Sequence, residues 1–286
     1  MTAIMILARM TFRQAIRRKI VLTGLLLGIG FLIVFSIGFH MISSTSMASF
    51  AQTAGGGQGI ENVMNGERNN GLTLAGLYAV TFLAIAMAAL LGADTLSNEI
   101  HSGTIQTLVT KPIRRSDVVF GKWLGFAGLL GLYMVLMAGG EIVSVYIQSG
   151  YSPPHLAAGL VLIYLESLLV MTIALLFSSR LSALATGGVI FGLYGMSFIG
   201  GWVEQIGAVL QNQTAVKVGI VTSLIIPSES LWRRAAFEMQ SPLSGVLGIS
   251  PFGATSVPSP LMIVYAAAYL LVCLGLAVWV FQRRDL

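Results

Sequence analysis

The sequence predicts an all-α integral membrane protein with six transmembrane helices. We also expect an amphipathic interfacial helix at the N-terminus, a cytosolic helix between the second and third spans, and an external helical segment between the fifth and sixth. First, 56% of the 286 residues are hydrophobic and only 9% are charged, whereas a soluble domain carries roughly 25% charged residues. Second, long apolar runs alternate with short polar segments. Third, Lys and Arg cluster beside these runs, as topology signals do, so the formal charge of +5 does not indicate a nucleic-acid partner.

Residues 1–19 form an amphipathic helix if they are helical. One side carries Ile4, Leu7, Ala8, Phe12, Ala15 and Ile16, and the opposite side carries Arg9, Arg13 and Arg17. This spacing is typical of a helix lying in the membrane interface with its cations toward anionic headgroups, so membrane lipids are expected partners. The alternative is an ordinary positively charged flank of the first span.

Residues 20–42 are predicted to be the first span, because about 23 apolar residues exceed the short core of a signal peptide. Arg17, Arg18 and Lys19 hold its N-terminal end in the cytosol. Residues 43–71 are rich in Gly and Ser and are expected to form a flexible external loop. The uncharged residues 72–93 are the second span.

A polar stretch, residues 97–117, separates the second span from the third, which covers residues 118–147. The part from Asn98 to Leu108 can form a short polar helix, and Pro112 stops it. We expect the stem of Lys122 to reach out to the membrane interface.

Residues 156–177, 181–203 and 261–281 are the remaining spans. The fifth contains Gly188 and Gly192, a spacing that lets two helices approach closely, either within the chain or across a dimer. Residues 204–260 mix short apolar and polar pieces, which predicts an external segment with interfacial or re-entrant helices.

Six spans place both termini in the cytosol, with twelve of the sixteen Lys and Arg residues inside. The other four, Arg68, Lys217, Arg233 and Arg234, lie outside, a bias that favours this orientation. A seven-span alternative would bring Arg233 and Arg234 inside but expel Arg283 and Arg284.

The sequence contains no recognisable catalytic or nucleotide-binding motif. Gly121-Lys122 lacks the upstream glycine and the following Ser or Thr of a P-loop, and no His/Cys cluster suggests a metal site. Two carboxylates, Glu141 and Glu166, lie deep in predicted spans. Ionisable groups at membrane depth mark either a substrate or ion path or a structural hydrogen-bonded pair between helices.

The polar stretch between the second and third spans resembles the sequence signature of ABC-2 type transporter permeases. The residues that carry the resemblance are Glu99, Ile100, Ser102, Gly103, Thr104, Leu108, Lys111, Pro112, Arg114, Gly121 and Lys122. The layout of the whole chain is similar as well, and the nearest subgroup is the one containing the permease of nitrous-oxide-reductase maturation.

The resemblance implies a permease that works as an exporter and binds no cofactor itself. In that family two permeases form a homodimer or heterodimer, and two copies of a separate ABC ATPase subunit bind ATP and Mg²⁺. It places ATPase coupling on Glu99, Ile100, Gly103, Thr104, Leu108, Lys111, Pro112 and Arg114. It also implies a prokaryotic inner or plasma membrane and leaves room for an external accessory protein.

Two other classes of function remain open on the sequence. A secondary transporter driven by an ion gradient would favour inverted repeats with broken helices, which the two halves of this chain do not clearly show. A non-transporting membrane scaffold that couples an ATPase to the assembly or maturation of another complex has the same sequence features as a permease.

Overall fold

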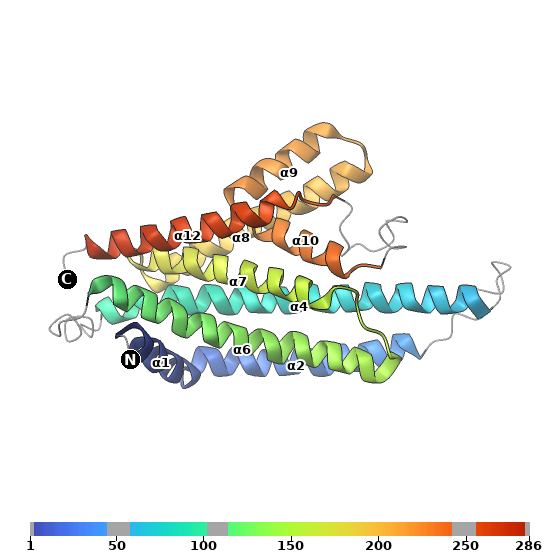
Figure 1. Ribbon diagram of the computed structural model, residues 1–286, viewed down its shortest axis with the longest axis horizontal. Coiled ribbons are helices and arrows are strands. Elements are labelled where there is room, and N and C mark those ends of the chain that lie inside the picture. The colour runs from blue at the N-terminus through green and yellow to red at the C-terminus, as the bar shows by residue number, and fades with distance from the viewer. Residues whose placement is uncertain (1–2, 45–57, 102–113, 242–255, 284–286) are drawn as a thin grey trace.

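The computed structural model describes residues 3–44, 58–101, 114–241 and 256–283, and each element within these ranges is a helix (Figure 1). Six helices are long and apolar enough to cross a membrane: α2 (Lys19–Ser43), α4 (Gln58–His101), α6 (Arg115–Ser149), α7 (Leu156–Ser178), α8 (Ala183–Val209) and α12 (Leu261–Gln282). The shorter helices are α1 (Ala3–Ile16), α9 (Gln213–Ile225) and α10 (Ser228–Met239). The prediction of an all-α multi-pass membrane protein is therefore confirmed.

The centre of the bundle is formed by α4 and α7, since 61% of the apolar window of each is buried. By contrast, the same share is only 11% for α2 and 28% for α8 and α12. Helices that are apolar all round yet lie at the edge of a bundle are stable only in lipid or against another protein. Both termini lie at one end of the bundle, opposite the connection between α6 and α7 (Figure 1).

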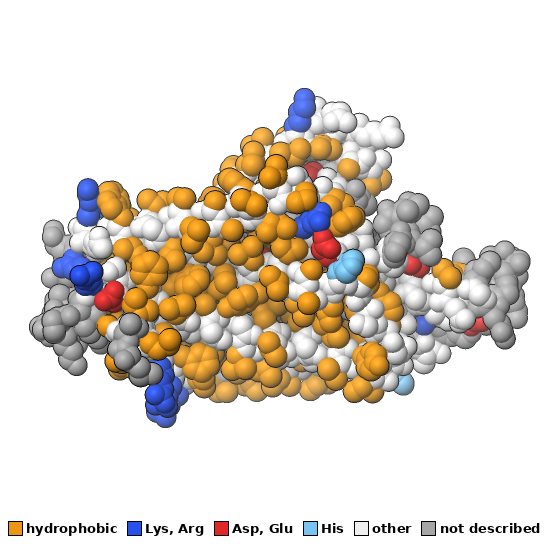
Figure 2. All heavy atoms as spheres, in the orientation of Figure 1, with side chains coloured by type: hydrophobic (Ala, Val, Ile, Leu, Met, Phe, Trp, Pro, Cys, Tyr) orange, Lys and Arg blue, Asp and Glu red, His pale blue; other side chains and the backbone are white. Residues whose placement is uncertain are grey.

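Charged side chains are sparse on the surface shown in Figure 2, where hydrophobic side chains cover most of the middle. Blue Lys and Arg side chains gather mainly at the left end, where α1 and the C-terminus lie. An apolar band with basic residues gathered at one end is typical of a protein that spans a membrane.

Two helices extend beyond the boundaries predicted from sequence. Residues 58–71, expected to be part of a flexible loop, are helical and form the first turns of α4. Two hydrogen bonds involve this part of α4: Thr73 donates to the Asn69 carbonyl, and Asn70 donates to the Met239 carbonyl at 3.0 Å. α8 likewise continues to Val209, so Glu204 is a helical residue rather than part of a loop.

The external segment between α8 and α12 contains a bent pair of helices. α9 and α10 meet at an angle of 108°, and neither is long enough to span a membrane. At the end of α10, the Met239 carbonyl accepts a hydrogen bond from Asn70, and the Ser241 amide donates one to it. Asn70 also donates to Tyr151, which lies in the α6–α7 connection. α8 also runs toward that end (Figure 1), so both ends of the bent pair point toward the same end of the bundle. A bent pair of this kind is either a re-entrant hairpin or a broken seventh span.

Candidate functional site

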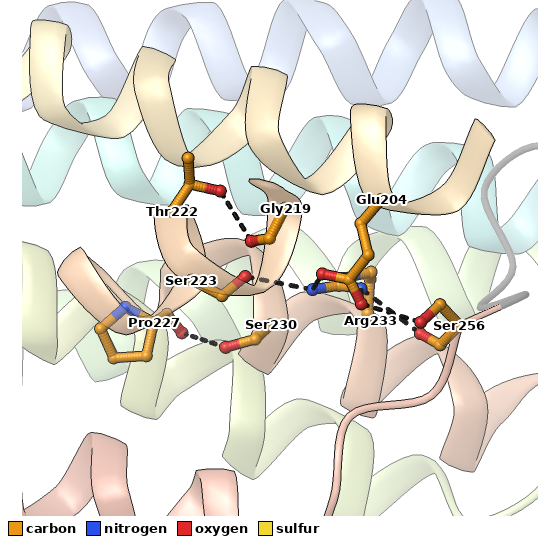
Figure 3. Close-up of polar contacts among 8 residues, drawn as sticks. All are labelled: Glu204, Gly219, Thr222, Ser223, Pro227, Ser230, Arg233 and Ser256. Carbon is orange, nitrogen blue, oxygen red and sulfur yellow. Dashed lines mark hydrogen bonds and ion pairs between the residues drawn. The ribbon is translucent and has the colours of Figure 1, made fainter. Parts of the chain in front are cut away.

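A buried ion pair holds the bent pair of α9 and α10, which we call the hairpin, against α8. The guanidinium of Arg233 on α10 contacts Glu204 on α8 through both nitrogens, with Nη1–Oε1 at 2.5 Å and Nη2–Oε2 at 2.9 Å. The two residues are only 1% and 4% exposed. Arg233 also donates to Ser223 Oγ at 3.2 Å, and Ser256 donates to Glu204 Oε1 at 2.8 Å (Figure 3). The bidentate geometry and the two hydroxyls satisfy most of the charge that burial removes from water.

Local sequence explains why the hairpin forms. Asn212 caps α9 by accepting from the amides of Thr214 and Ala215 at 3.0 and 3.2 Å. At the bend, the Ile226 carbonyl accepts from Ser197 on α8 at 3.0 Å, and Pro227 starts α10. These contacts fix the bend beside the middle of α8, which brings Arg233 level with Glu204.

The hairpin is anchored at its other end by Asn70. Its side chain donates to Tyr151 Oη at 2.6 Å and accepts from the Ser241 amide at 3.1 Å. Tyr151 lies outside the spans, and burial raises its pKa, so its hydroxyl stays protonated at neutral pH. The hairpin is thus tied to α4 and to the α6–α7 connection as well as to α8.

A cavity of about 480 Å³, which we call the hairpin pocket, lies between α9, α10 and the start of α12. Its polar floor includes Glu204, Ser223, Arg233 and Ser256. Its apolar walls include Ile220 and Leu224 of α9 and Leu261 and Met262 of α12. A volume of this size accommodates a small-molecule ligand.

The two carboxylates predicted to lie deep in spans are both completely buried, but in different places. Glu141 on α6 lies against Gly76 of α4, where an added Cβ would collide with its carboxylate and with Phe35. Glu166 on α7 interacts electrostatically with Glu229 of α10. In neither case do the carboxylate oxygens have a hydrogen-bond partner. The structure therefore does not join them in one hydrogen-bonded pair, and in this conformation neither contacts open water.

At the opposite end of the bundle, α1 packs across the start of α6. A Cβ at Gly121 would come within 2.5 Å of Leu7 Cβ, so only glycine allows this crossing. Arg9 and Arg13 of α1 are exposed, as is Arg17 in the turn that follows the helix. Lys122, expected to reach the membrane interface, is instead buried, with 5% of its surface exposed. α1 covers this part of α6, and the sequence pattern did not indicate that contact.

Most of the predicted ATPase-coupling residues lie outside the described residues. This applies to Gly103, Thr104, Leu108, Lys111 and Pro112. α4 continues without a break through Glu99 and Ile100 to His101, although the side chains of these residues are not described. Arg114 is exposed and forms the N-cap of α6.

No group of three or more His, Cys, Asp and Glu in the described ranges could hold a metal ion. The buried Arg233–Glu204 pair instead joins α10 to α8, in a bundle with six candidate spans and a bent pair of helices. These features define a multi-pass membrane protein.

The family is given by a comparison with protein-family models. Residues 5–286 match the model described as ABC-2 family transporter protein, so the chain belongs to that family. Within such a transporter it is the membrane component. A search of curated proteins found no match.

Proposed function

We propose that this chain is the permease subunit of an ATP-driven exporter in a prokaryotic inner or plasma membrane, with both termini in the cytosol. ATP and Mg²⁺ are bound by a separate ABC ATPase subunit present in two copies. The observation that supports this most strongly is the family match over residues 5–286.

The ATPase docks on the segment that carries Glu99, Gly103 and Arg114, and α1 forms a second contact. The packing supports this arrangement, because the segment joins α4 directly to α6 and α1 is seated on the start of α6. Movement of the docked subunit is transmitted to two core helices at once. ATP binding then shifts the bundle between two packed states, as a two-state transport cycle requires.

A pull-down tests this coupling. The chain, affinity-purified from its native membrane, is expected to retain an ABC ATPase, and Glu99→Ala and Gly103→Pro are each expected to weaken that association by about tenfold or more. Arg180→Ala is the matched control, since Arg180 is exposed in the α7–α8 turn at the same end of the bundle. Unchanged association in both coupling variants would remove this segment from the proposal.

Transport itself is tested in sealed vesicles that contain the purified complex. ATP-dependent movement of solute out of the compartment that contains the ATPase supports the exporter. Normal ATP hydrolysis without movement of any solute would favour the scaffold function. Solute movement driven by an ion gradient without the ATPase would favour a secondary transporter.

A further inference from the structure

The hairpin pocket has a polar floor, apolar walls and a mouth toward the membrane. Leu224 and Leu261, which line it, also expose 49% and 75% of their surface. They belong to α9 and α12, whose outer sides carry further exposed apolar residues such as Val221 and Val264. A ligand can therefore enter sideways from the outer half of the membrane without crossing a polar surface.

The floor of the pocket is electrically neutral. Arg233 and Glu204 cancel each other's charge. Their two mutual contacts, with those to Ser223 and Ser256, already occupy most of the ionic groups (Figure 3). A charged headgroup placed here would lose its hydration and gain no counter-charge. An uncharged polar headgroup meets no such penalty.

The floor nevertheless offers hydrogen bonds. Arg233 Nε–H is buried and has no hydrogen-bond partner. The hydroxyls of Ser223, Ser230 and Ser256 each make one contact, and a hydroxyl can both donate and accept. The Arg233 nitrogen has no surface open to the pocket, whereas the three hydroxyls line it and keep unused hydrogen-bonding capacity for the polar group of a ligand.

From this combination we propose that the hairpin pocket binds an uncharged amphiphile with a hydroxyl, ester or amide headgroup and one alkyl chain. The headgroup hydrogen-bonds with the hydroxyls of Ser223 and Ser256, and the alkyl chain lies between α9 and α12 against Leu224, Leu261 and Met262. Since the pocket is formed by one chain, binding does not require the ATPase. It is also independent of the direction in which the protein transports its substrate.

The test uses the purified full-length chain in detergent, without any ATPase. The probe is a monoacylglycerol with a photoreactive diazirine in its alkyl chain, and labelled peptides are mapped by mass spectrometry. We expect labelling concentrated in Gln213–Ile225 and in the first turns of α12. An unlabelled monoacylglycerol should compete at least about tenfold better than amphiphiles of equal chain length with a phosphate or a trimethylammonium head. Equal competition by the charged amphiphiles, or labelling spread over all lipid-facing helices, would overturn the proposal.

Variants that fill the pocket give a second measurement. Ile220→Trp and Met262→Trp place an indole within it, and each should reduce labelling by about fivefold or more. The matched controls are Val221→Trp and Val264→Trp, which change exposed neighbours that do not line the pocket and should label as the parent chain does. Parental labelling in both filling variants would contradict the proposal. If these variants are not monodisperse, the headgroup series on the parent chain still decides.

Discussion

At the scale of single residues, the most consequential feature is a charged side chain that never reaches water. Arg233 is among the largest side chains with less than 2% exposure, and it depends on Glu204 to offset its desolvation. Removing one member of such a pair is more damaging than removing both, because the remaining charge stays buried without its counter-ion. The pair therefore fixes the position of α10 relative to α8.

We expect Arg233→Met to destabilise the protein by about 3–5 kcal/mol, measured by thermal or denaturant unfolding in detergent. The double variant Arg233→Met with Glu204→Met should recover much of that loss. Arg234→Met is the control, because Arg234 pairs with Glu238 one turn away in a partly exposed position, worth about 0–1 kcal/mol. Equal losses for Arg233→Met and Arg234→Met would show that the buried pair does not stabilise the hairpin.

The sequence allowed some of these residues to be found but not others. Glu141 and Glu166 could be singled out because each interrupts a long apolar run. Glu204 and Arg233 could not, since they are 29 residues apart and no spacing in the predicted external helical segment indicates that its helices pair with α8. Glu204 neutralises Arg233 only because α9 folds back and brings α10 beside α8.

At the scale of elements, α1 illustrates what an amphipathic pattern can and cannot predict. The pattern predicts a helix with Arg9, Arg13 and Arg17 along one side. The structure has a helix over Ala3–Ile16 with Arg9 and Arg13 exposed, and Arg17 is exposed in the turn after it. It does not predict which span the opposite side contacts. That contact depends on Gly121 and Gly125 of α6, which leave room for Leu7 and Thr11.

We expect Gly121→Leu to displace α1 from α6 while leaving the bundle folded. Amide hydrogen exchange across Ala3–Ile16 should become about tenfold faster, because the helix loses the packing that protects it. Gly128→Leu is the matched control, since a Cβ there meets only Phe12 at an ordinary contact distance of 3.7 Å. Parental exchange rates in Gly121→Leu would indicate that α1 is held in place by other contacts.

At the scale of the whole molecule, hydropathy gave the spans and their approximate order, because each must supply enough apolar residues to cross the bilayer. It could not say which sides of the spans face protein, since lipid and a packed helix both favour apolar side chains. In the structure this difference is large: the apolar window of α7 is 61% buried and that of α2 is 11% buried. The bare sides of α2 and α8 are where a second permease could bind.

Gly188 and Gly192 provide a test of that second permease. Both are exposed on α8, and an added Cβ would meet no atom of this chain within 4 Å, so neither residue serves packing inside the described structure. If α8 contacts a second copy through them, Gly188→Leu and Gly192→Leu should each lower the dimer fraction by about tenfold, measured by single-molecule photobleaching in dilute bilayers. Gly275→Leu is the matched control, because Gly275 is an equally open position on α12. A decrease of the same size in Gly275→Leu would mean that added bulk anywhere on the lipid-facing surface disturbs assembly, whereas a decrease confined to α8 locates the dimer contact on that helix.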